Sequence, residues 1–269
     1  MASKKSKGNP VQGHGEAWEK EILQTVYGVY PESGISYTSI HDVPKELNQR
    51  TGKNVSIKCS GSKTVCFGDA SRIVETLGKN SPLEVIVVNY KQAGDVKQIQ
   101  QVDRLDFSSL GPALLGGNLE QTKNGIENLK ELVKTGNPLY KEASKALQKE
   151  MASNGSYFTI NPKVGNPAKK RAGRVQISIS GKNMGKLVKD HPGILKESER
   201  CSVHGCNLTE SLVSGRRTFG TKKEKSSSDS GKGVGKKSNK KITRRNLNKL
   251  SLSKDTLSKV EDLLHGASR

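Results

Sequence analysis

Aromatic residues, cysteines and long apolar runs are all scarce in this chain of 269 residues. The aromatic content of 4% argues against a protein that binds single-stranded nucleic acid by base stacking. No apolar run approaches the roughly 20 residues that a membrane-spanning helix needs. The first ten residues contain no apolar core of the secretory kind. We therefore expect an intracellular protein, nuclear if the host is eukaryotic, whose four cysteines stay reduced.

Positive charge is abundant, and it is spread over the whole chain. The 46 lysines and arginines outnumber the 26 acidic residues and give a formal net charge of +20. Residues 215–269 hold 16 basic and 5 acidic residues, so about +11 lies there and about +9 on the remainder. A polyanionic partner follows from this balance, and we expect double-stranded DNA rather than a membrane.

Hydrophobic periodicity predicts an α/β fold whose first half follows the order α-β-β-β-α-β. The near-continuous apolar run 83–90 is typical of a central strand that is buried on both faces. Asp69 is expected to cap the short helix that precedes this strand. The other expected elements of this half are a helix over 17–27 and strands over 35–40, 54–59 and 64–67.

The second half is expected to add two helices, over 118–134 and 138–151, and a late β-hairpin made of strands 157–160 and 174–180. The lysine-, serine- and glycine-rich stretch after residue 215 predicts a disordered tail with a short terminal helix. The expected organisation is therefore 1–12 disordered, 13–107 core, 108–214 extension for DNA recognition and 215–269 basic tail.

Three charged residues occupy unusual places in these elements. Glu19 falls on the apolar stripe of the first helix, where a carboxylate is costly without a partner. Asp42 follows the expected strand 35–40, and Lys58 lies inside a short strand that is otherwise largely apolar. Plainer readings exist: Glu19 at the edge of the stripe, Asp42 as a turn residue, and Lys58 on an edge strand with one wet face.

Two carboxylates and a lysine are the side chains that metal-dependent phosphodiester hydrolysis needs. Carboxylate oxygens bind Mg²⁺, which stabilises the developing charge, while the lysine positions or deprotonates a water molecule. Asp42, sixteen positions before Lys58 and after a helix that carries Glu19, resembles the PD-(D/E)xK nuclease superfamily. The resemblance covers roughly residues 13–107 and is nearest to type II restriction endonucleases.

This resemblance implies a restriction-endonuclease-like αβββαβ core and a sequence-specific, Mg²⁺-dependent DNA endonuclease, for which a homodimer is the assembly we consider. By the same resemblance Asp42 binds the metal, Lys58 serves the attacking water, and Glu19 completes the acidic cluster as a second metal ligand. The family carries its second acid two residues before the lysine, where this chain has Ser56. Glu19, Glu16 or Asp69 could supply the missing carboxylate.

Two other functions remain open at this point. Ser56 favours a noncatalytic, basic nucleic-acid-binding protein on a degenerate nuclease fold, whereas Glu19 on an apolar face favours catalysis. A structure-selective repair or recombination nuclease is the third possibility.

Two further segments carry candidate ligands. The loop between the late strands forms a basic β-ribbon suited to the major groove, although a solvated loop would have the same composition. Its candidate DNA-binding residues are Lys163, Lys169, Lys170, Arg171 and Arg174. Cys201, His204 and Cys206 could bind zinc, but their spacing matches no standard zinc pattern, and two free thiols are the simpler interpretation.

Overall fold

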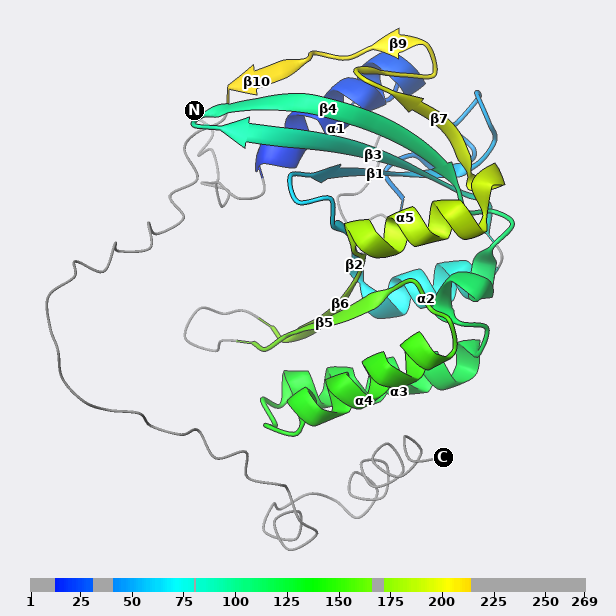
Figure 1. Cartoon of the computed structure of the whole chain (residues 1–269), viewed down its shortest axis with the longest axis vertical. Helices are drawn as coiled ribbons and strands as arrows, with labels where there is room; N and C mark the ends of the chain where they lie inside the picture. Colours follow the sequence, from blue (N-terminus) through cyan, green and yellow to red (C-terminus); the bar gives the residue numbers. More distant parts are fainter. Residues whose placement is uncertain (1–12, 31–40, 80, 166–171, 214–269) are drawn as a thin grey trace, which may run out of the picture.

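Two β-sheets and the helices packed against them make up the computed structural model, which describes residues 13–30, 41–79, 81–165 and 172–213 (Figure 1). The mixed α/β class expected from the sequence is confirmed, whereas a restriction-endonuclease-like core is not established by this arrangement. The expected strand 35–40, the expected disordered segment 1–12 and the tail 215–269 lie outside the described residues.

The helices and strands follow the predicted order closely up to residue 179. The helices are α1 (Gly13–Tyr27), α2 (Ala70–Gly78), α3 (Leu119–Lys134), α4 (Tyr140–Ser153) and α5 (Gly181–Asp190). Two short 3₁₀ segments, Gly111–Leu115 and Pro192–Ile194, accompany them. The strands are β1 (Asn54–Ser60), β2 (Val65–Asp69), β3 (Leu83–Ala93), β4 (Val96–Asp106), β5 (Thr159–Lys163), β6 (Arg174–Ile179), β7 (Leu195–Glu199), β8 (Ser202–Val203), β9 (Cys206–Asn207) and β10 (Ser211–Val213).

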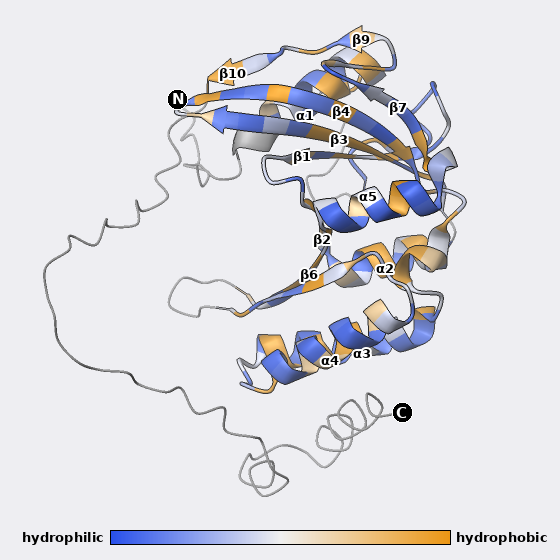
Figure 2. Cartoon of the chain, in the orientation of Figure 1, coloured by the Kyte–Doolittle hydropathy of each residue, from blue (hydrophilic) through white to orange (hydrophobic). Residues whose placement is uncertain are grey.

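The larger sheet is five-stranded, with the order β1-β3-β4-β10 and with β7 also paired to β4. Strand β1 runs parallel to β3, and β3 runs antiparallel to β4. As predicted, β3 is buried on both faces: Val85 and Val87 belong to one hydrophobic cluster, and Ile86 and Val88 to the other. Apolar and polar residues are interspersed along β4 (Figure 2), which buries Ile99 and Val102 in one cluster and Leu105 in the other.

The smaller sheet has the order β2-β6-β5, all antiparallel. The sequence indicates a turn between β1 and β2, and the structure shows that these two strands belong to different sheets. The turn directs β2 away from β1, with Ser60 Oγ donating to the Thr64 carbonyl and Lys63 in the left-handed region at φ 60°. Because β2 pairs with β6, and β4 pairs with β7 and β10, the segments 13–107 and 108–214 share both sheets.

Two hydrophobic clusters lie on opposite faces of the larger sheet. Helix α1 covers one face through Trp18, Ile22 and Val26, which are all buried. The other face packs toward α2 and the smaller sheet, behind which lie α3 and α4 (Figure 1). Helix α1 therefore packs on the face of the sheet where Val55 and Ile57 of β1 are buried, and Glu19 is carried to this face with the helix.

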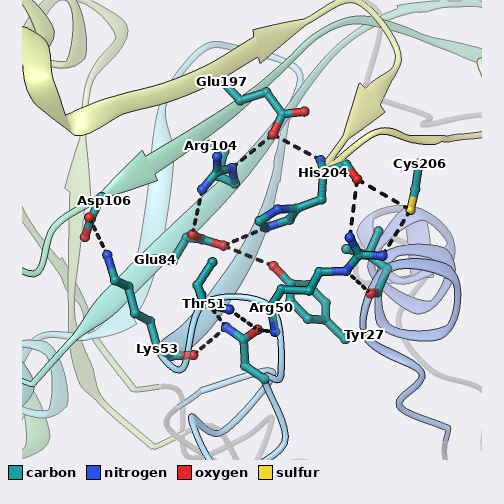
Figure 3. A network of polar contacts seen from close by, with 12 residues as sticks. Tyr27, Arg50, Thr51, Lys53, Glu84, Arg104, Asp106, Glu197, His204 and Cys206 are labelled. Atoms are coloured by element: carbon teal, nitrogen blue, oxygen red, sulfur yellow. Dashed lines mark hydrogen bonds and ion pairs between the residues drawn. The ribbon is translucent and has the colours of Figure 1, made fainter.

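A buried polar network fastens α1 to this sheet (Figure 3). Glu84 of β3 is only 1% exposed and accepts hydrogen bonds from Arg104 Nη1 at 3.0 Å and Tyr27 Oη at 3.1 Å, and its Oε1 lies 3.1 Å from His204 Nε2. Arg104 also binds Glu197 of β7. Burial alone would raise the pKa of Glu84, but hydrogen bonds from His204 and Arg104 outweigh it and hold that pKa below its ordinary value.

Arg50 extends the network to the end of α1. Its Nε donates to the Val26 carbonyl at 2.7 Å, and its guanidinium also reaches the His204 carbonyl and Cys206 Sγ. The last turn of α1 is thus bound both to β3, through Tyr27, and to the β8–β9 turn, through Arg50.

We predict that Arg104→Met destabilises the fold by about 2 kcal/mol, because the buried carboxylate of Glu84 would lose the guanidinium that pairs with it. This value is below that for a fully buried pair, since the Arg104 side chain is 18% exposed. Urea unfolding at neutral pH measures the loss. Lys134→Met, which breaks an exposed pair with Glu131 on α3, should change stability by less than about 0.5 kcal/mol. Equal effects of the two substitutions would contradict the structural role of the network.

Candidate active site

Asp42 is fixed against the outer edge of β1. Its backbone nitrogen donates to the Val55 carbonyl at 2.9 Å, and Val43 forms an antiparallel bridge with Val55. Its carboxylate oxygen Oδ2 accepts from the backbone nitrogen of Ile57 at 2.5 Å. Because both its backbone nitrogen and its carboxylate bind the backbone of β1, Asp42 has little freedom to leave the strand.

Lys58 reaches the same carboxylate from β1. Its Nζ lies 3.2 Å from Asp42 Oδ2 and 3.0 Å from the Ile57 carbonyl. The hydroxyl of Ser56 lies 3.4 Å from Asp42 Oδ2. The side chains of Lys58 and Asp42 are each roughly one-fifth exposed, so this ion pair is accessible to a ligand while remaining partly desolvated.

Glu19 approaches this pair from α1. Burial raises the pKa of Glu19 to about 7, with a further rise caused by the charge of Asp42 and an opposing effect from Lys58. Burial likewise raises the pKa of the neighbouring Cys59 thiol to about 12, with Glu19 as its next cause. The helix thus places a second carboxylate within electrostatic reach of Asp42 and Lys58.

The structure therefore brings Asp42 and Lys58 into contact and places Glu19 within electrostatic range of both. It also adds His41, whose pKa is lowered chiefly by burial while the charge of Asp42 opposes that shift. Sequence reasoning passed over this histidine, although its position next to Asp42 was a usable signal. Asp69 has a different role, because its carboxylate caps α2 by accepting from the backbone nitrogens of Ser71 and Arg72, as predicted.

The donor set of this site is two carboxylates. Among the described residues, no group of three or more histidine, cysteine, aspartate or glutamate side chains is placed to hold a metal ion. Within the same residues, the hydrogen bonds to the Asp42 carboxylate all go to Oδ2, which leaves Oδ1 for a cation. Carboxylate oxygens are the ligands that Mg²⁺ prefers, and the electrostatic repulsion between Glu19 and Asp42 would be relieved by a divalent cation.

The β-ribbon predicted for DNA recognition is partly described. Strands β5 and β6 pair antiparallel, and Lys163 lies opposite Arg174 at the end where the chain passes from one strand to the other. The other three candidates, Lys169, Lys170 and Arg171, lie outside the described residues.

The Cys201–Cys206 segment forms the β8–β9 hairpin, and its histidine is engaged elsewhere. His204 Nε2 lies 3.1 Å from Glu84 Oε1 in the buried network, while Cys201 Sγ donates to the Leu208 carbonyl. Both cysteines are free thiols. The simpler of the two sequence interpretations, a hairpin with two thiols, is the one that matches these contacts.

No protein-family model, curated protein or solved structure matches this chain. None of the described helices is long and apolar enough to cross a membrane.

We predict that Glu19→Gln increases stability more at pH 8 than at pH 5. The pKa of Glu19 is raised from 4.5 to about 7 on folding. Stability from its protonated form is thus fully present below about pH 4.5 and is lost as pH rises through 7. Glutamine stays neutral and removes this dependence. Metal-free urea unfolding of both proteins at the two pH values measures the difference, and a gain that is the same at both would contradict a raised pKa.

Proposed function

We propose that this chain is a Mg²⁺-dependent DNA endonuclease that hydrolyses phosphodiester bonds with an activated water molecule. The observation that carries the proposal is the contact between Lys58 and Asp42 at the edge of β1, with Glu19 of α1 within electrostatic range of both. A partly exposed acid and lysine with a second acid near them suit the chemistry of phosphodiester hydrolysis better than they suit a purely structural ion pair.

Asp42 and Glu19 would hold the metal. Bound there, Mg²⁺ would supply a Lewis acid that stabilises negative charge on the phosphate oxygens. Because the pKa of Glu19 is about 7, this carboxylate is ionised over only part of the neutral range, and protons compete with the cation for it.

Lys58 would orient the attacking water through its Nζ, which Asp42 and the Ile57 carbonyl hold in place. The water oxygen bonds to phosphorus, the bond from phosphorus to the leaving sugar oxygen breaks, and the water gives up a proton while the leaving oxygen gains one. The reaction needs no covalent intermediate on the protein.

Double-stranded DNA is the proposed substrate because the chain carries a formal charge of +20 and extends a basic pair, Lys163 and Arg174, on a two-stranded ribbon. A sequence-specific enzyme of the restriction type, acting as a homodimer, is the form we propose from the resemblance in residues 13–107.

A nucleic-acid-binding protein without nuclease activity is the second candidate, and Ser56 favours it. Ser56 is buried beside Asp42 at the position where the nuclease family carries its second acid. The serine hydroxyl is a weaker metal ligand than a carboxylate, so catalysis in this chain depends on Glu19 to replace the missing acid.

We predict that Asp42→Ala and Lys58→Ala each reduce DNA cleavage by several orders of magnitude while leaving DNA affinity largely intact, because each removes a necessary part of one catalytic unit. Supercoiled plasmid and branched DNA, incubated with Mg²⁺ or Mn²⁺, measure the activity. Discrete bands would indicate a restriction enzyme and branch cutting a resolving enzyme, while a mobility shift without cutting would leave only the binding protein.

Glu131→Ala and Lys141→Ala remove one acid and one lysine from α3 and α4 and serve as controls that should cut normally. Full cleavage by either active-site variant would overturn the assignment of Asp42 and Lys58.

A further inference from the structure

A groove lies beside the candidate active site, at the carboxyl ends of the parallel strands β1 and β3. Its volume is about 630 Å³. Crevices outside the carboxyl ends of parallel strands are the usual ligand sites of open α/β sheets. The groove is lined by the end of β1, by the β1–β2 turn, by residues 89–92 of β3 and by Gln100 of β4.

The lining carries positive charge. Lys63 and Lys91 are both exposed lining residues, and the other lining residues include hydroxyls, side-chain amides and the Tyr90 ring. None of the described residues that line the groove is an aspartate or a glutamate. In a site of this size, two lysines with hydroxyl and amide donors and no carboxylate suit an anion.

A third positive charge stands behind the wall of the groove. Lys97 of β4 is buried, and its Nζ lies 4.5 Å from the centroid of the Tyr90 ring. Trp18 contacts the same ring at a centroid distance of 5.5 Å and so holds Tyr90 in place as one side of the groove. Gly61 allows the turn to approach this wall, because a Cβ there would meet the ring at 2.9 Å.

The groove and the candidate active site share strand β1. Cys59 lines the groove, and the preceding residue, Lys58, binds Asp42. At the other end, Lys63 packs against Gly181, the first residue of α5, where a Cβ would come within 2.9 Å of Lys63 Cβ. The start of a ten-residue helix adds partial positive charge to this end of the groove.

We propose that the groove binds backbone phosphates of the nucleic-acid strand that enters the candidate active site, with Lys63 and Lys91 as the phosphate contacts. This inference rests on the proposed function for the identity of its ligand. It places the phosphate-binding lysines at the carboxyl end of β1, the strand that carries Lys58, so that a nucleic-acid strand lying in the groove would run toward Asp42 and Lys58.

The test measures binding without cleavage. Fluorescence anisotropy with a labelled 20-nucleotide duplex and the matching single strand, in EDTA and over a range of salt, is carried out on full-length protein. The variant Lys63→Gln/Lys91→Gln should weaken binding about tenfold or more near 0.1 M salt and lower the salt slope by about two, because two phosphate contacts are lost. The control Lys141→Gln/Lys145→Gln removes the same charge from the exposed side of α4 and should have a much smaller effect.

Equal losses in the two double variants would mean that only net charge matters and would overturn the groove, as would an unchanged affinity of the first variant. If both probes are weakened alike, the groove binds one strand; a loss confined to the duplex still supports phosphate contacts there. The plasmid assay is independent of this result: a chain that binds through the groove but never cuts would keep this inference and lose the proposed nuclease activity.

Discussion

The packing of α1 on the five-stranded sheet is the constraint on which the candidate site depends. Trp18 and Ile22 are fully buried on this face, and Trp18 Nε1 also donates to the Thr209 carbonyl near β10. These buried side chains fix the rotation of the helix about its axis, and that rotation turns Glu19 toward β1. The cost of partly desolvating that carboxylate is thus imposed by the apolar stripe that folds the helix, and the cost appears as a pKa of about 7.

Much of the fold could be predicted because its signals are local. The apolar run in β3, the Asp69 cap of α2 and the periodicity of α3 and α4 all lie within single elements. Helix α5 was missed because Gly181 and Gly185 weaken its helical pattern and only Leu187 is fully buried. The pairing of β2 with β6 was also missed, since a strand's own sequence does not specify a partner that lies more than a hundred residues away.

In the candidate site, too, local features could be predicted from the sequence and long-range contacts could not. The spacing of Asp42 and Lys58 marked both residues, and their contact arises because the chain returns antiparallel to β1 at Val43. Nothing in the sequence indicated that His204 would serve Glu84 instead of a metal, because that role depends on β3, β4 and the β8–β9 hairpin meeting in space. Glu84 is a carboxylate within the apolar sequence of β3, and its partners could be found only from the tertiary structure.

The distribution of charge along β1 links the two proposals. In a chain with a net charge of +20, the acids Glu19 and Asp42 adjoin the strand, and the lysines Lys63 and Lys91 border the groove at its end. The basic residues attract a polyanion. They do not explain why Glu19 and Asp42, whose negative charges repel each other, lie close to the same strand. Lys58 offsets part of this repulsion, and a proton on Glu19 offsets more of it until the pH rises above about 7. The divalent cation that we propose would replace that proton at higher pH and would act on a phosphate held by the groove.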